Sequence, residues 1–131
     1  MKPKFRCGTQ QAIEELSKEL KLPYDETMQD WSYQVAEPDD IEKYLAHYKL
    51  TTNEDKKFVL IEMILQALLE QKIPKQLLYH WEKTSEILTN DFNIHEYTID
   101  YWLRYTKEDF KLYNSLLKKV VKQNKISLKW T

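Results

Sequence analysis

The chain has 131 residues, of which 42% are hydrophobic and 31% charged, and its formal net charge is −1. This length suits a single domain, 1–131, and the composition supplies both a core and a hydrated surface, which argues against global disorder. Gly8 is the only glycine, and this excludes the glycine-built loops that hold phosphates in Walker and dinucleotide-binding motifs.

The sequence also predicts a compartment. MKPKFRCG has no apolar run of the kind that a secretory signal contains, and the apolar stretch 58–69 is too short and too polar to cross a bilayer. Cys7 is the only cysteine, so it cannot form an internal disulfide, which agrees with a reducing environment. We expect a soluble, cytoplasmic protein with no membrane association.

The first elements are a helix and an ordered loop. Thr9 is predicted to cap a helix that runs to about Leu22, where Pro23 ends it. The next residues lack a helical period, and their alternating pattern predicts a short extended segment near 30–36. A short helix beginning at Pro38 follows.

The remaining pattern is helical. Thr52 in TNED is predicted to start a helix that ends at about Lys72 and is apolar on nearly all sides over 58–69. Further helices are expected from Pro74 to about Asn90, over 97–103, where the period alone leaves helix or strand open, and from Thr106 in TKED onward. A second extended segment is expected near 125–130. Together these elements predict an all-α, compact bundle of about five to six helices around the central apolar helix 58–69.

Metal and catalytic motifs were tested on the three histidines, His47, His80 and His95. A zincin helix needs a second histidine where Ile99 stands, and no glutamate lies three residues before any histidine, as di-iron bundles require. A metal site built from distant histidines and carboxylates, or Cys7 acting with one histidine, stays open. We assign no catalytic, cofactor-binding or metal-binding residue and expect no cofactor.

The stretch NIHEYTIDYWLRYT, residues 93–106, offers the sharpest enzyme alternative. Glu96 and Asp100 would share a helix face beside His95, and paired carboxylates can divide acid and base roles. A solvated helix face is the favoured interpretation. The aromatic side chains could line a ligand pocket, although rings at helical spacing more often pack in a core; they are Tyr97, Tyr101, Trp102 and Tyr105.

Charge is unevenly distributed. Residues 24–56 hold nine acidic side chains against three lysines. Within this segment, several carboxylates surround Trp31 and Tyr33, a combination that suits a basic protein partner. The carboxylates would speed encounter, and the rings would act as anchors. The candidate partner-binding residues are Asp25, Glu26, Asp30, Trp31, Tyr33, Glu37, Asp39 and Asp40. A structural loop held by a buried Trp31 is the alternative.

The C-terminal part is basic, with eight Lys and Arg against two acids over 104–131. Lysines at helical spacing could follow a phosphate backbone; they are Lys111, Lys118, Lys122 and Lys125. The chain has only two arginines, Arg6 and Arg104, so bidentate reading of bases or phosphates would be poor. Non-specific nucleic-acid binding is therefore a less favoured alternative.

Four stretches resemble a family of small bacterial helical proteins with no established activity: FRCGTQQAIEELSKEL, MQDWSYQVAEPDD, DKKFVLIEMILQALLE and HEYTIDYW. The resemblance covers about the first hundred residues, and it implies a compact helical fold and no particular functional site. Size and composition are also generally similar to immunity proteins, which bind and neutralise toxins. We therefore expect a non-enzymatic protein-binding module, of the immunity-inhibitor type, that engages a basic partner through residues 24–40.

Overall fold

The computed structural model describes the backbone of residues 2–128 and the side chains up to Asn124. Within this range all regular secondary structure is helical, and no strand is present. The all-α class is confirmed, with seven α-helices in the described chain where about five to six were expected. The elements are α1 (Gln10–Glu19), α2 (Trp31–Val35), the 3₁₀ helix η1 (Pro38–Asp40), α3 (Ile41–Leu50), α4 (Glu54–Leu69), α5 (Pro74–Asn90), α6 (Phe92–Tyr105) and α7 (Lys111–Leu128).

The chain divides into two compact units, and the boundary falls within α5, between Lys83 and Thr84. The larger unit is Cys7–Lys83, and the smaller contains 84–128 and 2–6 of the described residues. The prediction of one domain for 1–131 stays a prediction. None of the helices described here is both long enough and apolar enough to span a membrane.

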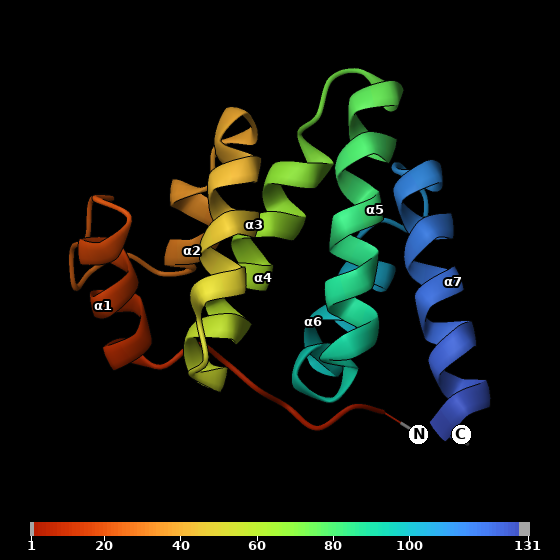
Figure 1. Cartoon of the computed structure of the whole chain (residues 1–131), viewed down its shortest axis with the longest axis horizontal. Helices are drawn as coiled ribbons and strands as arrows, with labels where there is room; N and C mark the ends of the chain where they lie inside the picture. The colour runs from red at the N-terminus through yellow and green to blue at the C-terminus, as the bar shows by residue number, and fades with distance from the viewer. Residues whose placement is uncertain (1, 129–131) are drawn as a thin grey trace. The chain divides into compact units, whose positions relative to one another are not determined.

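Helix α4 is the centre of the larger unit (Figure 1). It packs against α1, α2, α3 and η1, and nine of its residues are buried, including a continuous run from Phe58 to Ile61. A helix that is apolar on most of its circumference must be covered on most sides, which explains why the shorter helices gather around it. The expectation of a central apolar helix at 58–69 is confirmed within this unit.

Helix α1 begins as predicted and ends earlier than predicted. Thr9 caps it, because its side-chain oxygen accepts a hydrogen bond from the backbone N–H of Ala12 at 3.1 Å. Its end is a Schellman turn, in which Leu22 N–H donates to Ser17 O at 2.8 Å and Lys21 takes a left-handed conformation with φ 56°. Glycine usually occupies this left-handed position and marks the end of a helix in the sequence. Because Lys21 occupies it here, the sequence did not indicate that α1 ends at Glu19.

Both predicted extended segments are wrong. Residues Trp31–Val35 form α2, a one-turn helix whose buried Trp31 and Val35 lie on the side that faces α4, so their spacing fits a helix as well as a strand. At the other end, α7 continues to Leu128, so 125–128 are helical, and the rest of the second segment lies outside the described residues.

Two predicted helix starts are also displaced. Asn53, not Thr52, caps α4 and accepts from Lys56 N–H at 3.0 Å, in line with the stronger capping tendency of asparagine. Helix α7 begins at Lys111, not at Thr106. The Thr106 hydroxyl instead donates to Trp102 O at 2.6 Å, so it closes the end of α6.

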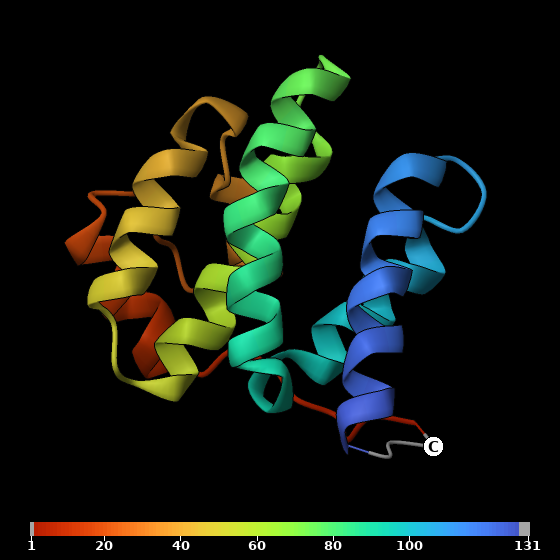
Figure 2. The same ribbon diagram turned by 45° about the vertical axis from the view of Figure 1, so that its right-hand side comes forward.

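In the smaller unit, α6 and α7 are joined by a turn and pack against each other (Figure 2). The segment 97–103 is helical, as its neighbours suggested. The buried rings of Trp102 and Tyr113 lie 5.9 Å apart between the two helices. Asn114 on α7 donates to Leu103 O on α6 at 2.8 Å, which fixes the turn between them.

Candidate functional site: the acidic segment 24–40

The structure separates the eight candidate residues into an exposed group and an inward-facing group. The exposed carboxylates are Asp25, Glu26, Asp30, Glu37 and Asp39, and Asp40 is half-buried. Trp31 is only 2% exposed, so its indole belongs to the core and is not presented to a partner. Tyr33 is half-buried. The carboxylates of the segment are therefore mostly exposed, whereas its two aromatic rings pack against the rest of the unit.

Side-chain hydrogen bonds fix the backbone of this segment at several points. The indole N–H of Trp31 donates to Pro23 O at 2.7 Å. Glu37 N–H donates to the Tyr44 hydroxyl at 3.0 Å, and the Gln71 amide donates to Pro38 O at 3.0 Å. Because each of these backbone groups has a partner, the loop can lie against the helices without leaving polar atoms unsatisfied.

The turn over 25–28 is fixed by its own side chains. The Asp25 carboxylate accepts from the backbone N–H of Thr27 at 2.8 Å and from its hydroxyl at 2.9 Å, and Met28 N–H donates to Asp25 O at 2.9 Å. The two bonds from Thr27 stabilise the ionised form of the carboxyl, and they lower the pKa of Asp25. A local Asx turn of this kind gives the loop a defined shape.

Asp30 starts α2 in a left-handed conformation, with φ 54°. Its carbonyl oxygen accepts from the N–H groups of Tyr33 and Gln34 at 3.0 and 3.1 Å, while its carboxylate makes no capping bond. Aspartate tolerates this backbone region better than most residues. The carboxylate of Asp30 therefore stays at the surface, beside a rigid one-turn helix.

Glu62, on α4, is the residue beneath this segment that the sequence analysis did not single out. Its two carboxylate oxygens accept hydrogen bonds from the Ser32 hydroxyl at 2.9 Å and the Tyr33 hydroxyl at 3.3 Å. Burial raises the pKa of Glu62 to about 7, and the negative charge of Asp30 acts in the same direction. No lysine or arginine of the described chain pairs with it. The available signal was a single carboxylate inside the apolar run FVLIEMILQALL.

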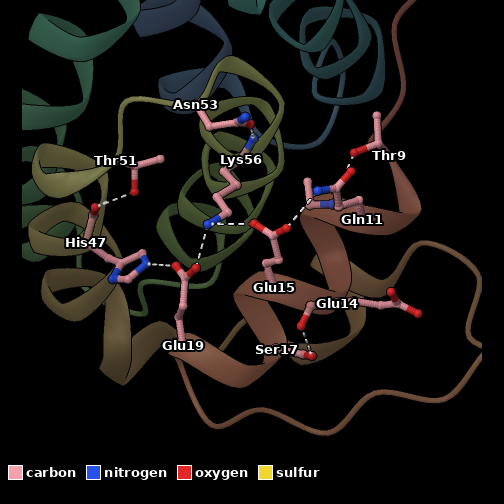
Figure 3. Close-up of polar contacts among 11 residues, drawn as sticks. Thr9, Gln11, Glu14, Glu15, Ser17, Glu19, His47, Thr51, Asn53 and Lys56 are labelled. Atoms are coloured by element: carbon pink, nitrogen blue, oxygen red, sulfur yellow. Dashed lines mark hydrogen bonds and ion pairs between the residues drawn. The ribbon is translucent and has the colours of Figure 1, made fainter.

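A second polar cluster ties α1, α3 and α4 together (Figure 3). Lys56 on α4 pairs with Glu15 at 2.9 Å and with Glu19, both on α1, and Glu19 is 2.7 Å from the imidazole Nε2 of His47 on α3. Lys56 lowers the pKa of both glutamates, and the glutamates in turn raise the pKa of Lys56. Ion pairs and hydrogen bonds thus join the three helices, and we call this group the clasp; it consists of Glu15, Glu19, His47 and Lys56.

The residues of the enzyme alternative are not presented together at an open site. His95 is fully buried, whereas Glu96 and Asp100 are half-buried on the same helix. Asp100 pairs with Arg104 at 3.1 Å, and burial raises the pKa of Glu96. Among the residues that the structure describes, no group of three or more histidine, cysteine, aspartate or glutamate side chains could hold a metal ion.

The other two candidate surfaces lie on the smaller unit. Lys111, Lys118 and Lys122 are exposed on α7, and the side chain of Lys125 lies outside the described residues. The four aromatic side chains proposed to line a ligand pocket have different surroundings. Trp102 is buried, and Tyr97 packs edge-on against Phe5. Tyr101 and Tyr105 stack on each other with their ring centroids 6.2 Å apart.

Comparison with protein-family models, with curated proteins and with solved structures found no match for this chain.

Proposed function

We propose that this protein is a non-enzymatic protein-binding module that engages a basic protein partner through the acidic segment 24–40, in the manner of an immunity-type inhibitor. The observation that carries the proposal is the fixed backbone of a segment whose carboxylates face solvent. A partner does not have to order such a segment on binding, so less conformational entropy is lost.

The charge of the larger unit supports the same function. Residues 7–83 contain fifteen acidic and nine basic side chains, a formal charge of −6. A net negative charge steers a positively charged protein during encounter and discriminates against partners that are also negative. An inhibitor of a nucleic-acid-processing enzyme would use carboxylates in this way, in place of the phosphates that the enzyme binds.

The experiment is affinity capture from the source cell with two quadruple variants of equal charge change. The first neutralises exposed carboxylates of the segment whose side chains make no bond that fixes its backbone: Glu26→Gln, Asp30→Asn, Glu37→Gln and Asp39→Asn. The control neutralises exposed carboxylates outside the segment: Glu82→Gln, Glu86→Gln, Glu108→Gln and Asp109→Asn. Neither set touches the core, so both variants should fold as the wild type does, which circular dichroism would verify.

The proposal predicts that the wild type and the control capture the same basic protein and that the segment variant loses it. Mass spectrometry identifies the captured protein, and its sequence gives its charge. Equal capture by both quadruple variants, or a captured partner that is acidic, would contradict the proposal.

A further inference from the structure

A pocket lies between the N-terminal part of the larger unit and the 25–28 turn. Its volume is about 420 Å³, within the range of sites that hold small molecules or single side chains. The lining residues are Gly8, Gln10, Ile13, Tyr24, Glu26, Met28 and Trp31. It therefore belongs partly to the acidic segment and partly to α1 and Gly8, the residue before its cap.

The lining combines apolar and acidic groups and contains no lysine or arginine. Met28 and Ile13 are half-buried and supply flexible apolar surface, while Glu26 is exposed. Methionine adapts its shape to the group it contacts, which suits a pocket that receives a side chain. A long side chain with an apolar stem and a positive end matches these walls.

Tyr24 lies where negative charge is concentrated. Desolvation, and after it the carboxylates of Glu14 and Glu26, raises the pKa of the Tyr24 hydroxyl. Glu14 also accepts from the Gln10 amide at 3.4 Å, which places this carboxylate beside a lining residue. A cation in the pocket would thus lie in the field of two carboxylates and beside a lining aromatic residue, which suits a cation–π contact.

We propose that the pocket is the anchor site for an arginine side chain of a basic protein partner, with the methylene stem against Met28 and Ile13 and the guanidinium against Tyr24 and Glu26. Arginine fits better than lysine because its planar guanidinium stacks on aromatic faces and is less strongly hydrated. This inference rests on the proposed function, since it names the chemistry by which that partner is held.

The test uses small probes, so it does not depend on having the partner. N-acetylarginine amide and its neutral isostere N-acetylcitrulline amide are titrated into the full chain, and nuclear magnetic resonance follows the Met28 methyl group and the Trp31 indole N–H. The arginine probe should give saturable shifts at both, with an affinity about two- to fivefold above that of the citrulline probe, the factor expected from one partly exposed charge contact.

Three variants test the assignment to this pocket. Glu26→Gln should weaken the arginine probe about two- to fivefold, whereas Glu37→Gln, in the same segment but outside the pocket lining, should leave its affinity unchanged. Met28→Trp should block binding by filling the space. Equal affinity for the two probes, an equal effect of Glu26→Gln and Glu37→Gln, or undiminished binding to the Met28→Trp variant would overturn the inference.

The outcome also separates this inference from the function on which it rests. If the acidic segment captures a basic partner but the arginine probe does not bind, the pocket assignment fails and the proposed function stands. If the probe binds but the segment variant captures the same proteins as the wild type, the proposed function fails instead.

Discussion

The indole N–H of Trp31 donates a 2.7 Å hydrogen bond to the carbonyl oxygen of Pro23, eight residues earlier in the chain. This contact closes the loop that carries Asp25, Glu26 and Asp30, and the ring itself is buried. Trp31 therefore helps to fix the geometry of the acidic segment without being available to a partner.

Replacing Trp31 should consequently act on stability. Trp31→Ala should lower the free energy of unfolding by about 3–5 kcal/mol, the range for removing a large buried aromatic side chain. Trp31→Phe retains most of the apolar contact and loses the N–H donor, so it should cost about 1–3 kcal/mol by leaving Pro23 O without this partner. Urea denaturation measures both values. A loss below 1 kcal/mol for Trp31→Ala would show that the ring does not anchor the segment.

Glu62 should make stability fall as pH rises towards and through neutrality. Its pKa is about 7 in the folded chain and 4.5 in an ordinary environment, so between these values the folded state binds more protons than the unfolded state. Stability due to protonated Glu62 is complete below pH 4.5 and is lost as pH rises through about 7. The full loss is about 3 kcal/mol for this shift.

The matched variant is Glu62→Gln, which keeps the shape of the side chain and removes its titration. As the pH rises from 5 to 8, the unfolding free energy of this variant should increase relative to that of the wild type. The reason is that only the wild type has to bury a carboxylate at the higher pH. Unfolding free energies at the two pH values give the comparison. A wild-type-minus-variant difference that does not change with pH would refute the role of Glu62.

The clasp around Lys56 should make a smaller, salt-sensitive contribution. Lys56→Ala should destabilise the chain by about 1 kcal/mol, near the upper end for partly exposed pairs, because one ammonium group joins two carboxylates. Lys49→Ala, an exposed lysine on α3, should change little. Thermal melts at low and high ionic strength would test this, and an effect of Lys56→Ala that is equal in both buffers would count against it.

The same clasp should also make the chain lose stability as the pH falls into the acid range. The pKa values of Glu15 and Glu19 are lowered in the fold, so their contribution is present above the ordinary pKa of glutamate and is lost as pH falls through the lowered values. The acid transition of Lys56→Ala should therefore be shallower than that of the wild type, as followed by circular dichroism. Identical acid transitions would contradict the ion pairs.

The end of α1 offers a stabilising change. Lys21 has φ 56°, a conformation that costs a residue with a Cβ and costs glycine almost nothing. Lys21→Gly should therefore raise the unfolding free energy by up to about 1 kcal/mol. The same substitution at Lys18, inside the helix, should lower it by about 1 kcal/mol. If both variants changed the unfolding free energy in the same direction, the Schellman turn would not explain the effect of Lys21→Gly.

The sequence predicted most of the helices, although not α2, because their signals are local. The all-round apolar run 58–69 and the Thr9 cap are patterns of neighbouring residues, and both are confirmed. What could not be predicted depends on contacts between distant residues: Ser32 reaches Glu62 thirty positions away, and Glu19 reaches Lys56 thirty-seven positions away.

The candidate site shows the same limit. The density of carboxylates in 24–40 is visible in the sequence, but whether Trp31 points outward as an anchor or inward as a core residue depends on the packing of α2 against α4. The pocket beside Tyr24 was likewise not predictable, because it forms where the 25–28 turn meets residues 8–13.

The most direct test of the central claim is the affinity of the captured partner for this chain as a function of ionic strength. Binding through the acidic segment predicts a Kd that rises with salt for the wild type, and a weaker affinity with a shallower salt dependence for the segment variant. The control, in which four carboxylates outside the segment are neutralised, should behave as the wild type does. A segment variant that binds as tightly as the wild type, with the same salt dependence, would contradict the claim.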